Sequence, residues 1–276
     1  MKLVVLSDGP TGPGFKLTMS SMNAHTSQTE QTAQALAKLG LPAEALPRHI
    51  AVIMDGNGRW AQARGKPRVF GHQQGAKAVR AIVTECARLE LEALTLYSFS
   101  IENWKRPADE VDCLMQLYVD YLGQERATMM ENNVQFRQIG RREGLPQSVL
   151  DELDRTIEIT QNNTGLTLAL AINYGSRTEI TDAVRAISRK IKAGSLDPDH
   201  IEPKTISDHL YTAGLPDPDL MIRTAGEMRL SNYLLWQISY AELYVADVCW
   251  PDFDVEQLRQ ALRAYAGRQR KFGAVL

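Results

Sequence analysis

The chain has 276 residues, 44% of them hydrophobic, which is enough for one large core. The 31 lysines and arginines are balanced by 33 acidic residues, and the net charge of −2 excludes the basic field typical of a nucleic-acid partner. Cys86, Cys113 and Cys249 are far apart and form no CxxC pair, which argues against disulfides and zinc and favours a cytoplasmic protein.

Residues 1–46 are predicted to be a poorly ordered extension. Most of this segment is rich in Gly, Pro, Ser, Thr and Gln, with at most a short helix around Thr29 to Leu39. The apolar run Leu3 to Leu6 is too short for a signal peptide or a membrane span. The remainder, 47–276, is predicted to form one folded domain.

Apolar runs and helical segments alternate through the folded part. The expected strands are Ile50–Met54, Ala93–Phe99, Val134–Ile139, Leu166–Asn173, Leu220–Arg223 and a sixth near Leu243–Val248. The expected helices are Gly75–Leu89, Glu110–Asn132, Pro146–Asn162, Ser176–Ala193 and Val255–Ala266. This alternation predicts an α/β fold with a mostly parallel, six-stranded sheet and helices on both faces.

The first expected strand ends in a polar turn, from Asp55 through Gly56, Asn57 and Gly58 to Arg59. Ligands of open α/β sheets bind beyond the carboxyl ends of the strands, and a glycine-rich turn there can present N–H groups to an anion. Asp55 could hold a divalent cation, and Arg59 offers a fork for phosphate oxygens. A solvated turn is an equally open interpretation.

Two further groups of cations follow. Arg64, Lys66, Arg68 and His72 lie close to the first turn, where a solvated basic loop is the alternative to a diphosphate site. Arg223 ends the fifth expected strand, and with Arg229 and Ser231 it predicts a second anion site. Two phosphate sites would indicate two phosphorylated substrates.

Two single residues leave alternatives open. Ser231 resembles the N-cap of a helix at Tyr233–Trp236, which competes with a binding role. Glu242 lies among apolar neighbours, where it would pair with an arginine or bind a metal. No P-loop and no GxGxxG occurs, so nucleotide and dinucleotide sites are not indicated.

Several long motifs resemble the cis-prenyltransferases, specifically the bacterial undecaprenyl diphosphate synthase type, over about residues 47–273. The motifs are His49–Ala61, Gly71-His72 with Gly75, Phe99–Pro107, Asp219–Gln237, Tyr240–Tyr244 and Trp250–Phe253. The resemblance implies a Mg²⁺-dependent enzyme that condenses isopentenyl diphosphate onto an allylic diphosphate such as farnesyl diphosphate, making a long cis-polyprenyl diphosphate for cell-wall synthesis. The domain 47–276 would then be the catalytic domain.

The resemblance also implies roles for individual residues. Asp55 and Asn103 are the implied catalytic residues, with Asp55 and Glu242 as Mg²⁺ ligands, the latter reached across a homodimer interface. The residues implied to hold the allylic diphosphate are Gly56, Asn57, Gly58, Arg59, Arg68, His72 and Arg106. Ser100 and Asn103 are implied to assist the condensation and proton removal, and Trp104 to shape the site. Trp60 and Glu102 are further implied substrate-binding residues. Isopentenyl diphosphate would be held by Arg223, Arg229 and Ser231.

An apolar tunnel for the product is implied as well, with walls from Leu114, Leu117, Tyr118, Leu122 and Leu166. The lipid product would be delivered to the membrane, with the enzyme at its inner face. Ala225 departs from the family pattern, in which a glycine stands between Thr224 and Gly226. The alternatives are a shorter-chain synthase, a non-catalytic partner subunit of a prenyltransferase, and a metal-dependent phosphohydrolase.

Overall fold

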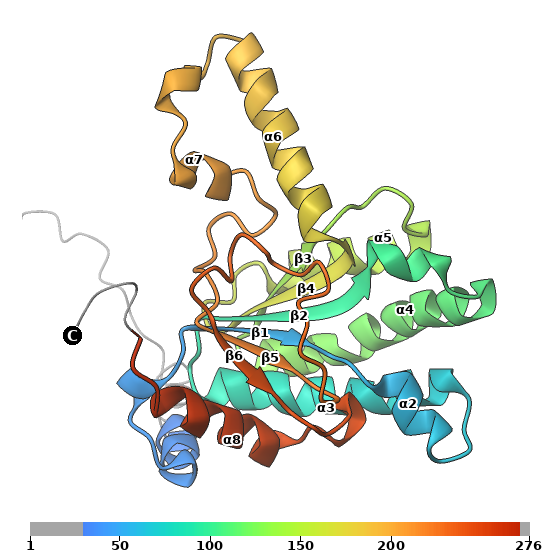
Figure 1. Cartoon of the computed structure of the whole chain (residues 1–276). Helices are drawn as coiled ribbons and strands as arrows, with labels where there is room; N and C mark the ends of the chain where they lie inside the picture. The colour runs from blue at the N-terminus through green and yellow to red at the C-terminus, as the bar shows by residue number, and fades with distance from the viewer. Residues whose placement is uncertain (1–29, 271–276) are drawn as a thin grey trace, which may run out of the picture.

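A single six-stranded sheet forms the centre of the computed structural model, which describes residues 30–270 (Figure 1). The strands are β1 (His49–Ile53), β2 (Ala93–Ser100), β3 (Gln135–Ile139), β4 (Thr167–Tyr174), β5 (Leu220–Arg223) and β6 (Glu242–Val245). Their order is β3-β4-β2-β1-β5-β6, and every pair is parallel. The predicted fold class is therefore confirmed, and all the carboxyl ends of the strands meet at one edge.

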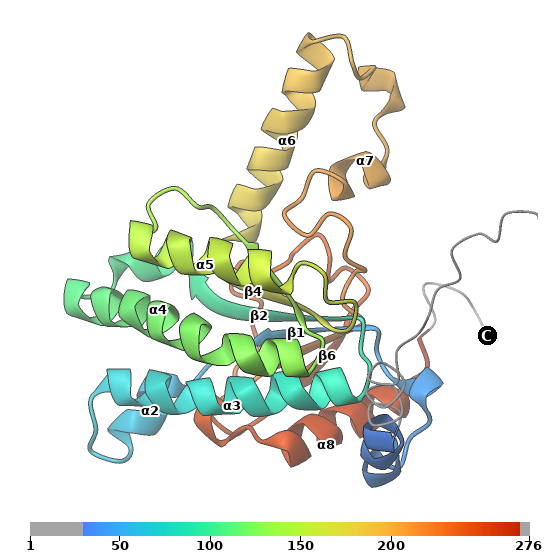
Figure 2. The same ribbon diagram turned by 180° about the vertical axis from the view of Figure 1, so that it is seen from behind.

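The two faces of the sheet are covered differently. Four helices pack on one face, as Figure 2 shows from behind: α3 (Arg68–Arg88), α4 (Ala108–Glu131), α5 (Gln147–Thr160) and α8 (Val255–Ala266). The other face is covered by the segments 211–215 and 230–241, and Tyr233 and Leu234 of the second segment are fully buried against it. Helix α6 (Ser176–Lys192) joins this face by its first turn and then projects away toward α7 (Pro203–Ser207), with the 3-10 turn Pro198–His200 between them.

Helix α2 is not among the predicted helices, and α3 begins earlier than the sequence predicts. The segment expected to be a turn and a basic loop contains α2 (Asn57–Gln62), and α3 starts directly after Pro67 rather than at Gly75. The glycines that weaken the helical pattern have a packing reason. A Cβ at Gly71 would lie 1.9 Å from the carbonyl oxygen of Asn57, so only glycine lets α3 approach α2 this closely.

The expectation of a poorly ordered extension does not describe residues 30–46. Residues 30–39 form a helix whose Ala35 and Leu39 are buried in the core, and a 3-10 turn, Ala43–Ala45, leads into β1. Two apolar residues one turn apart are enough to dock so short a helix. Residues 1–29 lie outside the described part of the chain, and the boundary at 46/47 stays a prediction. Within 30–270, no helix is long and apolar enough to cross a membrane.

His49 begins β1 as a buried, neutral imidazole. Its Nδ1–H donates to the carbonyl of Pro216 at 2.6 Å, and Nε2 accepts from the Thr95 hydroxyl at 2.8 Å. Burial lowers the pKa of His49 to about 4, outweighing the opposing effect of the hydrogen bond to Pro216. Because this pKa lies below the unfolded value, the unfolded chain binds the extra proton, and stability falls as the pH drops from about 6.5 toward 4.

We therefore expect the free energy of unfolding to fall by on the order of 2 kcal/mol between pH 7.5 and pH 5 through His49 alone. Urea titrations at the two pH values measure this change. In His49→Gln the difference should shrink by that amount, whereas His200→Gln, on a side chain that is 79% exposed, should leave it unchanged. An unaltered pH dependence in His49→Gln would contradict this account.

Candidate active site

Polar side chains from three neighbouring strands meet at the carboxyl edge of the sheet. Asp55 follows β1, Ser100 ends β2, and Arg223 ends β5. The parallel register pairs Ile53 with both Tyr97 and Arg223, which sets these side chains beside one another. A shift in register between β2 and β4 after Tyr97 marks the same edge, where bulges often re-aim side chains next to functional sites.

Asp55 lies at the centre of this edge. Its Oδ2 accepts from Arg223 NH2 at 2.8 Å, its Oδ1 lies 3.3 Å from Arg59, and Arg229 is 3.9 Å away. Burial acts to raise the pKa of Asp55, but hydrogen bonds from Arg223 and from the Gly56 N–H outweigh it and hold the pKa below its ordinary value. The carboxyl group is therefore ionised at neutral pH and can serve as a cation ligand.

The turn after Asp55 is the N-terminus of α2. Gly56 is its N-cap in a left-handed conformation, with φ 97°, and no side chain caps the helix. A Cβ on Gly56 would lie 2.8 Å from Cys249 Sγ and 2.9 Å from Ala225 Cβ, so glycine is required on two grounds. No side chain caps the N–H groups of this first turn, so the predicted anion site stays a candidate here.

A second set of cations gathers around Glu110 on α4, a residue that the sequence analysis did not single out. Arg68 Nε and Arg106 NH1 each lie 3.1 Å from its carboxylate oxygens, and His72 Nε2 lies 3.8 Å away. Burial and the charge of Arg106 lower the pKa of His72 to about 4, so the imidazole is neutral at physiological pH. The spacing of Arg106 and Glu110, four residues apart, was the available signal.

Arg223 and Arg229 form another cationic group, which faces Asp55 from β5 and the loop after it. Arg223 is only 4% exposed and donates to Ser231 Oγ at 2.7 Å and to the carbonyl of Arg229. Glu227, which also had no predicted role, accepts from both Arg59 and Arg229 and so connects the two sides of the site. Residues 231–240 form turns, so the alternative of Ser231 as a helix N-cap is wrong.

Among the residues that line the cavity, two have a buried nitrogen without a hydrogen-bond partner in the described part of the chain: His72 Nε2 and Arg223 Nε. Buried polar groups are nearly always paired, so such donors indicate a place where an external acceptor binds. Both residues line the same cavity, which is why an oxygen-rich ligand there would satisfy them.

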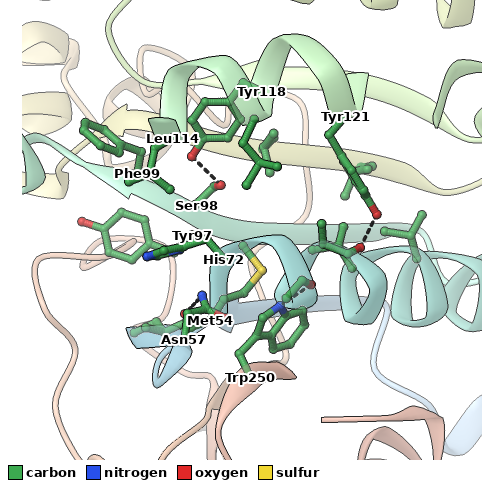
Figure 3. A pocket seen from close by; sticks show the side chains of 18 of the residues that line it. Met54, Asn57, His72, Tyr97, Ser98, Phe99, Leu114, Tyr118, Tyr121 and Trp250 are labelled. Carbon is green, nitrogen blue, oxygen red and sulfur yellow. Dashed lines mark hydrogen bonds between the residues drawn. The ribbon is translucent and has the colours of Figure 1, made fainter. Parts of the chain in front are cut away.

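The cavity has a volume of about 550 Å³ and lies between the sheet and helices α3 and α4 (Figure 3). Its mouth is polar and its interior is largely apolar. The predicted site residues at the mouth are Asp55, Asn57, His72, Ser100, Glu102, Asn103, Arg106, Arg223 and Ser231. Of the predicted tunnel residues, Leu114, Leu117, Tyr118 and Leu122 line the cavity, whereas Leu166 is buried outside its lining.

The remaining predicted residues surround the mouth. Three arginines are held there by ion pairs: Arg59 and Arg229 with Asp55, and Arg68 with Glu110. Gly58 lies against the Arg68 guanidinium. Other side chains hold the loops in place. Trp104 donates to Asn173 Oδ1 at 2.8 Å and packs edge-on against Phe99.

Further contacts fix the loop after β2 and helix α2. Asn103 Oδ1 accepts from the Ser100 N–H at the start of the 3-10 turn Ile101–Lys105, and Glu102 accepts from Asn232. Trp60 stacks with Phe70 and lies under the Arg64 guanidinium. These contacts of Asn103, Glu102 and Trp60 hold the loop after β2 and helix α2 in place.

Glu242 is not brought to Asp55 within one chain. It is the first residue of β6, in register with Leu220 at the start of β5, so it lies at the opposite edge of the sheet. Its carboxylate accepts a hydrogen bond from Arg268 at 2.7 Å, so within one chain Glu242 pairs with an arginine, the first of the two alternatives that the sequence leaves open. Among residues 30–270, no three His, Cys, Asp or Glu side chains are grouped to hold a metal.

Ala225, behind Gly56, has a left-handed backbone with φ 69°, a conformation that disfavours any side chain. We expect Ala225→Gly to stabilise the fold by up to about 1 kcal/mol, because the relief of strain exceeds the added entropy of the unfolded chain. Urea unfolding measures the change. Ala193→Gly is the matched control: Ala193 has φ −80°, so glycine there should destabilise, and equal effects at both positions would refute the strain.

The sequence profile of the family described as putative undecaprenyl diphosphate synthase matches residues 53–273. The chain belongs to this family. The isoprenyl transferase of Rhodopirellula baltica is 51% identical over 230 residues, covering 83% of this chain and 94% of that protein. The isoprenyl transferase of Shouchella clausii is 50% identical over 230 residues, covering 83% and 90%. The protein is thus a prenyltransferase, as the motifs predict.

Solved structures of related prenyltransferases have the same fold. Lavandulyl diphosphate synthase from Lavandula x intermedia, solved with dimethylallyl diphosphate, is 38% identical with a TM-score of 0.82, covering 83% of this prenyltransferase and 99% of that chain. A probable undecaprenyl diphosphate synthase from Campylobacter jejuni is 33% identical with a TM-score of 0.68, covering 82% and 98%.

Proposed function

We propose that this prenyltransferase extends an allylic diphosphate, such as farnesyl diphosphate, by successive cis-condensation with isopentenyl diphosphate, giving a long-chain polyprenyl diphosphate for cell-wall synthesis. The observation that carries the proposal is a pair of cationic groups at the mouth of an apolar cavity, with Arg59 of one group and Arg223 of the other both contacting Asp55. Each group suits one diphosphate, and the cavity suits a prenyl tail. The family membership supports the same reaction class.

The first diphosphate would bind at the N-terminus of α2 and at Arg59, Arg68 and Arg106. There it would displace Glu110 as the partner of Arg68 and Arg106, and neutral His72 would donate a hydrogen bond to it. Breaking the allylic C–O bond sends its electron pair to the departing diphosphate, whose growing charge these donors stabilise. The arginines act on the transition state because their positions are fixed in advance.

Isopentenyl diphosphate would bind at Arg223, Arg229 and Ser231, with its double bond beside the allylic carbon. A new C–C bond then forms, and loss of a proton restores a double bond in the cis configuration. Ser100 and Asn103, at the mouth, are the proposed residues that assist the condensation and the proton loss. Glu102 and Trp104 would shape this part of the site.

The donor set at the mouth fits Mg²⁺. This ion usually takes one or two carboxylates and completes its shell with water and substrate phosphates, which matches the ionised Asp55 beside two proposed diphosphate sites. When bound, Mg²⁺ would supply charge stabilisation for the leaving diphosphate. Glu242 would contribute only if a second chain presented it.

A homodimer is part of the proposal. Strand β6 is an edge strand, and large apolar side chains are exposed on it and near it: Leu243, Tyr240 and Met228. Such side chains favour burial against a second copy. Cys86, Cys113 and Cys249 are all free, which fits the proposed place in the cytoplasm at the inner face of the membrane, where the lipid product would be delivered.

Purified protein incubated with farnesyl diphosphate and labelled isopentenyl diphosphate tests the reaction. Label extractable into butanol is expected with Mg²⁺ and not after chelation. Absence of product in both conditions would refute the proposal, and release of phosphate without chain growth would indicate a phosphohydrolase. A non-catalytic partner subunit is disfavoured, because such subunits usually lack the acidic residue that is present here as Asp55.

A further inference from the structure

One strip of the largely apolar cavity lining carries polar side chains. Tyr121, Glu125, Thr128 and Asn132 all line the cavity, and their spacing of four, three and four residues places them along one face of α4. On α3 the lining residues Ala76, Arg80 and Thr84 recur every four residues. We call the line where these two rows of residues meet the α3–α4 seam.

Two side-chain contacts hold the seam closed. Arg80 Nε donates to the two carboxylate oxygens of Glu125 at 2.8 and 2.9 Å, and Tyr121 donates to the carbonyl of Ala76, as the dashed line in Figure 3 shows. The Glu125 side chain is 5% exposed, whereas that of Arg80 is 54% exposed. Arg80 therefore touches both the cavity and the solvent, and the seam is a place where the cavity lies one side chain from the surface.

The position of the seam relates it to the growing tail. Arg80 follows His72 by eight residues on α3, which corresponds to about 12 Å along the helix axis. A prenyl chain whose diphosphate is held near His72 thus reaches the seam after its first few units. A cavity of 550 Å³ has the size that encloses a drug-sized ligand, so a longer chain needs additional space.

The seam is the wall that can supply this space most easily. On the sheet side, residues such as Phe99, Leu168 and Phe136 belong to hydrogen-bonded strands and are almost fully buried, so moving them would break the ladder. Opening the seam exchanges polar contacts for contacts with water, and the Arg80 side chain, which is 54% exposed, already contacts solvent. Glu125 would gain water as it lost Arg80, so no charge is left buried and unpaired.

We propose that the α3–α4 seam, held by Arg80, Glu125 and Tyr121, is a determinant of product length. This inference rests on the proposed chain elongation. While the seam is closed it bounds the cavity, and the tail meets it as the chain grows. Elongation ends when adding another isoprene unit would require α3 and α4 to separate further than the Arg80–Glu125 and Tyr121–Ala76 contacts permit. Weaker contacts should therefore give longer products, and a filled seam should give shorter ones.

The test compares product lengths by mass analysis under one set of conditions. Arg80→Leu/Glu125→Leu removes both charges together, so that neither remains buried alone, and it should lengthen the main product by at least one isoprene unit. The charge swap Arg80→Glu/Glu125→Arg should restore the length seen without substitution. Arg142→Leu/Asp154→Leu, which removes an exposed ion pair outside the cavity lining, is the control and should change nothing.

A second variant keeps the test decisive if the double substitution impairs folding, which thermal unfolding will reveal. Thr128→Phe fills the seam from α4 and should shorten the main product. The KM values for both diphosphates should stay within about twofold, because the seam lies away from the polar mouth. Unchanged product lengths in folded seam variants would overturn the inference. Absence of any prenyl product from the unsubstituted protein would instead overturn the proposed function.

Discussion

Asp55→Asn is expected to reduce the rate of chain elongation by at least about 10²-fold, the loss seen when one preorganised electrostatic group is removed from an active site. Asparagine keeps the size of the side chain and one oxygen, so the fold should persist. What disappears is the negative charge between the two cationic groups. With it goes the anionic oxygen that would hold Mg²⁺ against the leaving diphosphate.

Kinetics at saturating concentrations of both diphosphates, over a range of Mg²⁺ concentrations, measure this loss. Because hydrogen bonds from Arg223 and Gly56 hold the pKa of Asp55 below its ordinary value, its ionisation should not limit the rate at neutral pH. The matched control is Asp252→Asn, a half-exposed aspartate paired with Arg64 on the outer side. Near-normal turnover in Asp55→Asn, or an equal loss in both variants, would refute the role of Asp55.

The sequence is most informative where the physics is local. Strands such as β1 are buried along their whole length, so an uninterrupted apolar run predicts them well. The parallel sheet then places the residue after each strand at one edge. This is why Asp55 and Arg223, 168 residues apart, could be expected to lie together, as the bond between them shows.

Features that depend on contacts between distant segments were less accessible. The start of α3 was missed because Gly71 lowers helix propensity, while its packing against Asn57 is visible only in three dimensions. Glu110 and Glu227 neutralise arginines that the motifs assign to substrates, and only Glu110, four residues after Arg106, has a local signal for this in the sequence. Glu242 directly precedes the expected strand Leu243–Val248, so the strand pattern already places it at the amino end of β6, away from Asp55.

Arg223→Lys is expected to raise the KM for isopentenyl diphosphate by roughly 10- to 100-fold while changing the KM for the allylic diphosphate by less than about threefold. Lysine keeps the charge but lacks the planar fork of arginine. In Arg223 this fork donates to Ser231 and Asp55, and its buried Nε has no hydrogen-bond partner in the described part of the chain. A lost charge-assisted hydrogen bond is worth about 1.5–3 kcal/mol, which corresponds to this range of affinity.

Initial rates with each diphosphate varied in turn separate the two effects. Arg229→Lys is the comparison, since Arg229 is mostly exposed and lies 3.9 Å from Asp55, so its replacement should raise the same KM less. The urea midpoint of Arg223→Lys shows whether the buried site tolerates the change. An increase confined to the allylic KM would mean that the two diphosphate sites are assigned the wrong way round, because Arg223 would then belong with the α2 side of Asp55.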